Sequence, residues 1–438
     1  MKYLREPRPG IFVFDHRLTP EVRAMFCAMV SRLPAGGIAQ RYKEVVDAIG
    51  EHGEEALTEY PLHPRVQRFF DEFVGRYGHS SILELTGSPA IVVEGVSWLT
   101  AWLLFDSPLV AGQEFSTRAV RFKDWPLARE AEGNPVLEAL HRDWLEVFEA
   151  EVEWWTEHLS DPANRQALGI GDKEPFRPAL DRARWALPGT IATGAAFACH
   201  MRDRARTLRD ASTVAPHPLW DDIAAAYRDA VPGIAAYGLR ESVHADDAPK
   251  APAHLEFLLI QPGSNELSVG ITPVLDDFFA TRRKRKNSYA DPIYNAAFRV
   301  NVNIPCSLAV ARDWHRHRTL YPWTLSVVPH PKTGIGIHPA YEPKSALGKE
   351  RTPGLLLQSY KAAMAASGLF PSALCYPLGT EVAVSASGGL RDVLYMLELR
   401  GNTHGANFEY KDQALKLLQF LLDGLNDEER NGVGYLDR

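Results

Sequence analysis

The chain has 438 residues, of which 45% are hydrophobic and 24% charged, a composition typical of a globular protein with room for two or three domains. Its formal net charge of -7 argues against general electrostatic binding to nucleic acid or to an anionic membrane. The charged start lacks the apolar run of a signal peptide, and no stretch reaches about 18 uninterrupted apolar residues. We therefore expect a cytoplasmic protein without a membrane span.

The first half of the chain contains a predicted strand that leads into a helix and then into a polar loop. Ala90 to Val93 form a short β-rich run, and Ser97 opens the helical stretch Trp98 to Phe105. The loop runs from Asp106 to Ala119, and a long amphipathic helix is predicted over Val136 to Leu159. Five residues of that helix are expected to face inward: Leu137, Leu140, Trp144, Phe148 and Trp155.

A polar, proline-bearing stretch from His244 to His254 is predicted to link two domains, at residues 1–240 and 241–438. After it, Phe298 to Ile304 alternates apolar and polar residues, which predicts a half-buried strand. The stretches Leu355 to Ala366 and Ala373 to Leu399 are helical in tendency, although two adjacent glycines weaken the second.

Two other features of the sequence concern ligands. The cationic run R-R-K-R-K, Arg282 to Lys286, favours a solvated loop because no aromatic residue is interleaved with it; a phosphate-binding or nucleic-acid patch is the alternative. The four cysteines are scattered, and no pair has the spacing of a zinc site or a redox motif. We expect no metal centre, and a reducing compartment fits.

The stretch A-R-D-W-H-R-H-R, Ala311 to Arg318, crowds three arginines and two histidines into eight residues. No glycine or proline lies between Cys306 and Tyr321, so a helix is predicted, with the last basic residues at its C-terminal end. Two interpretations stay open. Cations near a helix C-terminus commonly stabilise the helix, by about 0.3 to 1 kcal/mol each. Alternatively, the basic residues form a binding site.

The same order of elements occurs on both sides of the predicted linker: a strand, a helix, a polar loop and long helices. Ala101 and Ala311 are 210 positions apart, and Arg202 and Arg391 are 189 positions apart, at matching places in this order. Side-chain identity between the halves is low. The layout therefore predicts two tandem repeats and a fused pseudo-dimer.

The basic stretch resembles the signature of the flavin-dependent thymidylate synthases, R-H-R-x-x-S-x-N-E-x-S-x-R-Y. Arg316, His317 and Arg318 correspond to the R-H-R, and Ser326 corresponds to the later serine. The sequence then departs from the signature, because Thr324 replaces the glutamate and the final arginine and tyrosine are absent.

The first half keeps the parts of this signature that the second half lacks. An aspartate, a serine and a proline, from Asp106 to Pro108, stand where R-H-R belongs, and Ala119 replaces the closing tyrosine. The residues that resemble N-E-x-S-x-R are Gln113, Glu114, Ser116 and Arg118. The residues that resemble the family's preceding G-H-x-x-x-x-E element are Gly78, His79 and Glu84.

Two further segments resemble the family. Ala183 to Pro188 is similar to its helix segment with a nucleotide-phosphate arginine, here Arg184. The segment L-E-L-R-G-N-T-H, with Arg400 and His404, is similar to the family's C-terminal L-x-L-R-x-x-x-H and follows Arg391. The two halves thus complement each other.

The resemblance implies an α/β (α+β) fold of two tandem thymidylate synthase-like repeats, each a β-sheet packed with long helices. It also implies a homodimer that rebuilds the family's tetramer as a pseudo-tetramer, with a composite site between the repeats. FAD is the implied cofactor, and NADPH and methylenetetrahydrofolate are the implied co-substrates. A small nucleotide is the expected partner, with no nucleic acid and no membrane.

The resemblance also assigns residues to roles. The implied cofactor-binding residues are His79, Arg316, His317, Arg318, Arg391 and His404. The implied substrate-binding residues are Glu114, Ser116, Arg118 and Arg184, and the implied catalytic residues are Ser116, Glu114 and Arg400. Guanidinium groups suit this task because their planar fork matches phosphate oxygens in two-pronged fashion.

The predicted function is that of a methyltransferase in nucleotide biosynthesis. It transfers a methylene group to C5 of a uridine nucleotide, dUMP by default, with hydride from reduced flavin. One alternative is a flavin enzyme of the same fold that acts on a different pyrimidine or a specialised metabolite, motivated by Ala119 and by the unmatched first 70 residues. The other is a catalytically inactive nucleotide-binding relative, motivated by the missing motif parts.

Overall fold

The computed structural model describes the chain except for residues 34–36, 51–52, 77–79, 88, 118–125, 171–174, 234–252, 257, 260–261, 274–297, 402–406 and 425–438. The chain divides into two compact units. Unit 1 comprises Met1–Pro252 and Lys344–Pro377, and unit 2 comprises Ala253–Pro343 and Leu378–Arg438. Both units combine helices with antiparallel sheets, which confirms the predicted α+β class.

This division differs from the expected boundary at 240/241 in one important respect. The segment Lys344–Pro377, which the sequence places in the second domain, belongs to unit 1. Most of the predicted linker and the whole cationic run Arg282 to Lys286 lie outside the described residues.

Unit 1 contains one sheet of five strands among its described residues, in the order β1-β2-β3-β5-β4, and all neighbouring strands run antiparallel. The strands are β1 (Leu4–Arg8), β2 (Ile11–Phe14), β3 (Ala90–Val96), β4 (Val110–Glu114) and β5 (Thr193–Cys199). The predicted run Ala90 to Val93 is therefore the first part of β3, in the middle of the sheet.

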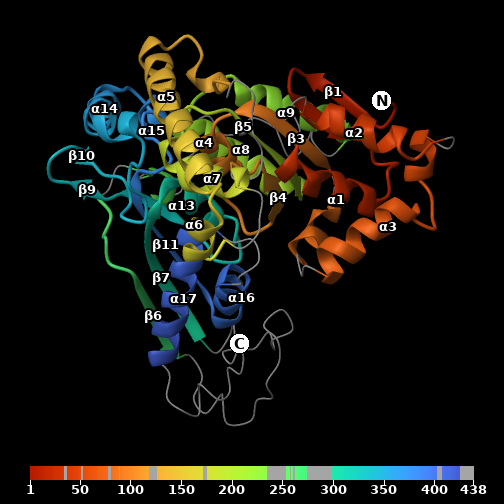
Figure 1. Ribbon diagram of the computed structural model, residues 1–438. Coiled ribbons are helices and arrows are strands. Elements are labelled where there is room, and N and C mark those ends of the chain that lie inside the picture. Colours follow the sequence, from red (N-terminus) through yellow and green to blue (C-terminus); the bar gives the residue numbers. More distant parts are fainter. Residues whose placement is uncertain are drawn as a thin grey trace. The chain divides into compact units, whose positions relative to one another are not determined.

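Helices cover both faces of this sheet. Alternate residues of each strand point to opposite faces, and apolar side chains lie on both of them. On β5, Ala196 and Ala198 belong to an apolar cluster with the side chains of the first 70 residues, while Phe197 between them packs on Phe105, with ring centroids 4.7 Å apart. The first face is covered by α1 (Pro20–Met29), α2 (Gly37–Asp47), α3 (Pro64–Phe70) and the short helices η1 (Val30–Arg32), η2 (Gly53–Leu57), η3 (Asp71–Arg76) and η4 (Ser80–Thr86) (Figure 1). The second is covered by α4 (Trp98–Phe105), α8 (Met201–Val214) and α9 (Leu219–Ala230).

The N-terminal layer is held in part by an ion pair next to β2. Arg17 donates to both carboxylate oxygens of Asp15, at 2.9 and 3.0 Å, and these hydrogen bonds lower the pKa of Asp15 to about 2. A carboxyl group whose pKa is lower in the folded state stabilises the fold above its unfolded-state pKa of about 3.9, and this contribution is lost as the pH falls toward 2.

We expect Asp15→Asn to lower the free energy of unfolding by about 1 kcal/mol at pH 7, because solvent screens an arginine that is half exposed. At pH 2.5 the variant and the wild type should differ by less, since the wild-type carboxylate is then partly protonated. Urea unfolding at the two pH values measures both differences. An equal difference at both pH values would contradict this account.

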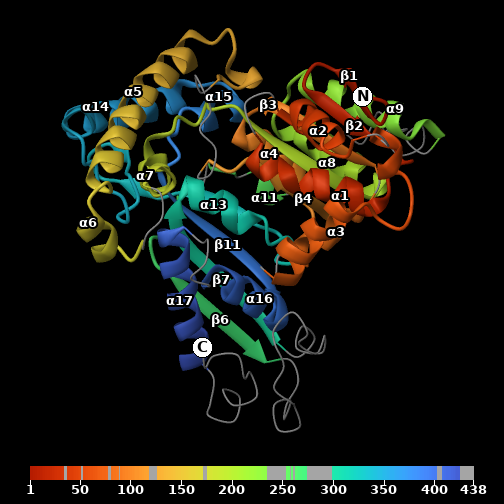
Figure 2. The same ribbon diagram turned by 45° about the vertical axis from the view of Figure 1, so that its right-hand side comes forward.

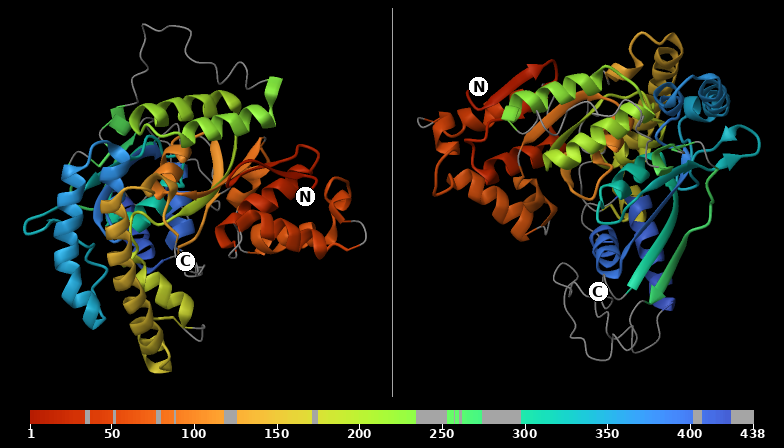
Figure 3. Two further views of the ribbon diagram at one scale, coloured as in Figure 1. Left: turned by 90° about the horizontal axis from the view of Figure 1, so that it is seen from above. Right: turned by 180° about the vertical axis from the view of Figure 1, so that it is seen from behind.

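A second group of helices in unit 1 joins two distant segments of the chain. Its members are α5 (Pro135–His158), α6 (Pro162–Ala167), α7 (Phe176–Ala183), α14 (Ala346–Ala365), α15 (Leu369–Leu374), η5 (Arg129–Ala131) and η6 (Arg184–Ala186). All five residues predicted to face inward on α5 are buried. One of them, Trp144, donates its indole N–H to Ser359 Oγ of α14 at 3.0 Å, and the two helices run side by side (Figure 3). This packing explains why residues 344–377 belong to unit 1.

Unit 2 contains a four-stranded antiparallel sheet among its described residues, in the order β6-β7-β11-β8. The strands are β6 (Ser268–Pro273), β7 (Phe298–Ser307), β8 (Thr324–Val327) and β11 (Glu381–Gly389), with a separate hairpin of β9 (Pro329–His330) and β10 (Gly334–Ile335). The helices are α11 (Ala253–Glu256), α13 (Leu308–His315), α16 (Leu390–Gly401) and α17 (Phe408–Asp423). Helices α16 and α17 pack against each other and against strands of the sheet (Figure 2).

The two units contain matching elements at the offsets seen in the sequence. Helices α4 and α13 are 210 positions apart at both ends, and so are their N-cap residues, Ser97 and Ser307. Helices α8 and α16 begin 189 positions apart. Helix α8 directly follows β5, and helix α16 directly follows β11. The strand registers also match. Val96 pairs with Thr193 in unit 1. Cys306, which is 210 positions after Val96, pairs in unit 2 with Val382, which is 189 positions after Thr193. Each unit thus contains a strand, a serine-capped helix, a second strand and a second helix in the same arrangement.

Candidate functional site

The basic stretch of unit 2 follows a helix whose start is fixed by a buried carboxylate. Ser307 ends β7 and caps α13, because its Oγ accepts a hydrogen bond from the backbone N–H of Val310 at 3.3 Å. Glu409 of α17 accepts from the backbone N–H and from the hydroxyl of Ser307, both at 2.7 Å. All eight residues of α13 are buried. The helix that leads to the basic residues is therefore buried along its length and anchored at its start.

The predicted helix over Cys306 to Tyr321 is too long at both ends. Cys306 pairs with Val382 in the sheet, and the helix ends at His315, with Arg316 as its C-cap. His317 and Arg318 consequently lie beyond the helix and not, as predicted, in its last turn. They lie where the chain leaves the helix toward β8.

His317 is buried beside α16. Arg400, near the end of that helix, donates from Nε to His317 Nε2 at 2.9 Å, and the indole N–H of Trp323 donates to the His317 backbone oxygen at 3.2 Å. Because Nε2 accepts a hydrogen bond, the neutral ring carries its proton on Nδ1. The Arg400 guanidinium carbon also lies 4.8 Å from the ring centre of Tyr410, within cation–π distance.

Burial and positive charge together keep the His317 ring neutral. The pKa of His317 is well below its ordinary value because burial disfavours the charged form and because the charges of Arg400, Arg318 and Arg316 repel it. Asp313, 3.8 Å from Arg316, acts in the opposite direction. Arg400 thus contacts a ring without charge, on which the charges of Arg316 and Arg318 also act, and such a group of arginines is suited to an anion with several oxygen atoms.

Aromatic residues support this arginine group from α13 and α17. The rings of Trp314 and Tyr410 pack at right angles with centroids 4.1 Å apart, and the Tyr410 hydroxyl donates to the Asp313 backbone oxygen at 2.9 Å. The indole N–H of Trp314 donates to Gln413 at 3.1 Å. The base of the site is therefore a packed, hydrogen-bonded core.

The charge of Arg400 has a measurable effect on His317. We expect Arg400→Leu to raise the pKa of His317, because the largest repelling charge is removed. The pH dependence of the ring signals in a nuclear magnetic resonance spectrum measures this pKa. Arg299→Leu is the matched control, since Arg299 lies exposed on β7 and bonds Ser387. An unchanged His317 pKa in the Arg400 variant would contradict the electrostatic account.

Of the other predicted cofactor residues, Arg391 is not part of this group. Arg391 lies in the first turn of α16 and Arg400 in its last, so about 13 Å of helix separates them. His79 and His404 lie outside the described residues.

Three of the four predicted substrate residues of unit 1, Glu114, Ser116 and Arg184, lie in its described part. Glu114 ends β4 and is buried, with its Oε1 3.5 Å from the Thr193 hydroxyl, and the backbone N–H of Ser116 donates to the Ser31 oxygen at 3.1 Å. The predicted polar loop, Asp106 to Ala119, thus contains the largely buried strand β4. Arg184 is 1% exposed and starts η6, which packs on α5 and α7, with its Nε 3.8 Å from Asp181. Arg118 lies outside the described residues.

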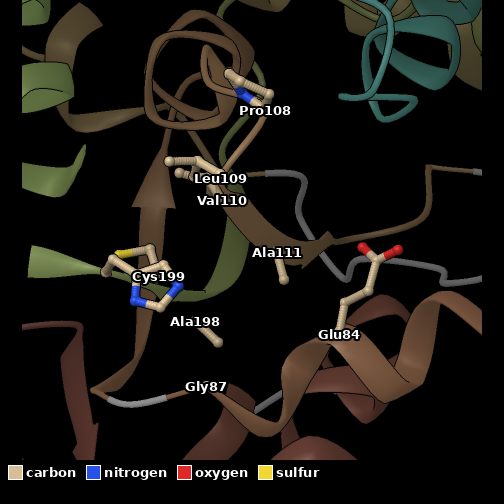
Figure 4. A pocket seen from close by; sticks show the side chains of 9 residues that line it. Glu84, Gly87, Pro108, Leu109, Val110, Ala111, Ala198 and Cys199 are labelled. Carbon is tan, nitrogen blue, oxygen red and sulfur yellow. The ribbon is translucent and has the colours of Figure 1, made fainter. Parts of the chain in front are cut away.

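In unit 1, Asp106 to Pro108 stand at the position that matches R-H-R, and Pro108 lines a small pocket. Asp106 is the C-cap of α4, as Arg316 is of α13, and Arg206 of α8 donates to its backbone oxygen at 3.2 Å. The pocket beside it has a volume of about 230 Å³ (Figure 4). Its lining is Glu84, Gly87, Pro108, Leu109, Val110, Ala111, Ala198, Cys199 and His200. No arginine is among these described residues, so the two units differ in charge at this position.

Several residues that shape the site in unit 2 were missed from the sequence. Tyr410 carries a usable signal, because it lies four residues before Ala414 on the apolar stripe of α17. Glu409 carries none, since its partner Ser307 is 102 positions away. The bond between Arg400 and His317 could not be predicted either, because it spans 83 positions.

The described part of the chain contains neither a cluster of metal ligands nor a membrane-spanning helix. No group of three or more histidine, cysteine, aspartate or glutamate side chains there is arranged to hold a metal ion. Among the described helices, none is long and apolar enough to cross a membrane. Comparison of the sequence with models of known protein families and with curated proteins gave no match.

Proposed function

We propose that the protein is a flavin-dependent enzyme of the thymidylate synthase type. It would transfer a methylene group to C5 of a uridine nucleotide, dUMP by default, and complete the methyl group with hydride from reduced FAD. The observation that carries this proposal is the bond of Arg400 to the neutral ring of His317, which lies between Arg316 and Arg318 in the chain and is affected by the charges of both.

The charge of this group fits the pyrophosphate of FAD. A pyrophosphate presents several anionic oxygens in a short span, and each charged hydrogen bond to it typically contributes about 1.5 to 3 kcal/mol. A protonated histidine would add a further charge and repel the arginines, so a neutral ring allows three guanidinium groups to lie close together. The low pKa of His317 meets this requirement.

The matching elements of the two units support an origin by duplication. The helices with serine caps lie 210 positions apart, and R-H-R follows the second of them. Unit 1 retains the residues that resemble N-E-x-S-x-R instead. A duplicated gene whose copies specialised would produce this division, and we propose that the chain is a fused pseudo-dimer that associates as a homodimer.

In this proposal the protein binds and orients its ligands and supplies no covalent nucleophile. Arg316 and Arg318 bind the cofactor's phosphates, and Glu114 with Ser116 faces the nucleotide. FAD, when bound and reduced, supplies the hydride, while NADPH and methylenetetrahydrofolate are the co-substrates. The sequence departs from the family's signature at several positions; Thr324 stands for its glutamate in the second half, and Ala119 stands for its closing tyrosine in the first.

Turnover tests the proposal. Purified protein with FAD, NADPH and methylenetetrahydrofolate is incubated with dUMP, UMP or their nucleosides in parallel, and the products are identified by mass spectrometry. We expect a gain of one methyl group on dUMP, coupled to NADPH oxidation. Product from another pyrimidine alone would favour the alternative substrate. FAD binding without any product or sustained NADPH oxidation would favour an inactive relative.

A further inference from the structure

The hydrogen bond between His317 and Arg400 uses the acceptor atom of the histidine. His317 is 7% exposed, and its Nε2 accepts from Arg400 Nε at 2.9 Å. A histidine whose acceptor already has an arginine partner cannot use that atom for a ligand. Its main partner in the structure is therefore another side chain of unit 2.

Arg400 is held on two sides by this arrangement. His317 binds its Nε, and the ring of Tyr410 lies 4.8 Å from its guanidinium carbon. Tyr410 is itself fixed by its hydroxyl bond to Asp313 and by its contact with Trp314. Among the described residues, Nε is the one nitrogen of Arg400 with a hydrogen-bond partner, so the two terminal nitrogens of the fork are left for an anion.

Holding an arginine in one position favours anion binding. The side chain of arginine has many rotamers, and ordering it on binding opposes association. A guanidinium that is already ordered avoids this loss. The neutral state of His317 is necessary, because an imidazolium has no acceptor for Arg400 Nε.

We propose that His317 is a positioning residue, whose Nε2 holds the Arg400 guanidinium ready for a phosphate group. This inference rests on the proposed function, since it takes the cofactor's pyrophosphate as the anion. It assigns His317 a different role from the direct cofactor contact that the resemblance implies.

A double-mutant cycle tests this role, with inorganic pyrophosphate as the probe and calorimetric titration as the measurement. We expect His317→Leu and Arg400→Met each to weaken binding about 10-fold, and the double variant to be weakened about 10-fold as well, because both changes remove the same ordered guanidinium. Effects that multiply to about 100-fold would overturn the proposal, since His317 would then act independently of Arg400.

A conservative variant and a control complete the experiment. His317→Gln retains a side-chain acceptor and should recover part of the lost affinity, whereas a purely steric role of the ring would give no recovery. Arg299→Leu should bind as the wild type does. Pyrophosphate binding with coupled effects but without FAD binding would remove the proposed function and leave the positioning role. Binding of neither probe by the wild type would overturn both.

Discussion

Glu151→Ala is expected to lower the free energy of unfolding by about 3 to 5 kcal/mol, because the change removes the acceptor for several buried donors. Glu151 of α5 is fully buried and accepts from the backbone N–H groups of Lys344 and Ser345 and from the Ser345 hydroxyl, at 2.7 to 3.1 Å. Burial raises the pKa of Glu151, and the three donors oppose that shift. Urea unfolding at pH 7 measures the loss.

Two variants make the Glu151 experiment specific. Glu151→Gln retains the shape and one acceptor oxygen, so it should cost less than the alanine change. Glu146→Ala is the matched control on the same helix, because Glu146 is 61% exposed and pairs with Arg351 at the surface, where an ion pair contributes about 0 to 1 kcal/mol. Equal losses for Glu151→Ala and Glu146→Ala would contradict the stabilising role of the buried contact between Glu151 and Ser345.

The double variant Arg316→Ala/Arg318→Ala is expected to weaken FAD binding by about 10²- to 10⁴-fold, which is the loss of two charged hydrogen bonds. Quenching of flavin fluorescence during titration measures the affinity. The unfolding midpoint should change little, because both side chains are partly exposed beyond the end of α13. Arg299→Ala serves as the control and should keep its affinity within about two-fold. Unchanged FAD binding in the double variant would exclude this group as the cofactor site.

Local signals predicted those parts of the fold that neighbouring residues determine. The helix Trp98 to Phe105 has the predicted bounds, because Ser97 provides the cap and the buried run follows it directly. The prediction over Ala373 to Leu399 was wrong for its middle part, where β11 lies. Small residues such as Ala383 and Ala386 do not oppose a helix, but pairing with β7 on one side and β8 on the other determines a strand.

The candidate site, likewise, could be predicted only where neighbouring residues determine it. The basic residues after α13 were found because they are adjacent in the sequence. The contacts that give them chemical character come from α16 and α17: Arg400 bonds His317 and adds to the effect of burial on its pKa, and Glu409 fixes the start of the helix. Both residues are more than eighty positions from their partners, and no periodicity or spacing encodes such a distance.

The most direct test of the central claim is the visible absorption spectrum of the purified protein after incubation with FAD and removal of free cofactor by gel filtration. We predict that FAD stays with the protein, that its two oxidised flavin bands are present, and that they bleach on reduction with NADPH or dithionite. The account would be contradicted if all FAD eluted in the free fraction and a titration up to about 1 mM FAD showed no binding. A dissociation constant of about 1 mM corresponds to a binding free energy of only about 4 kcal/mol.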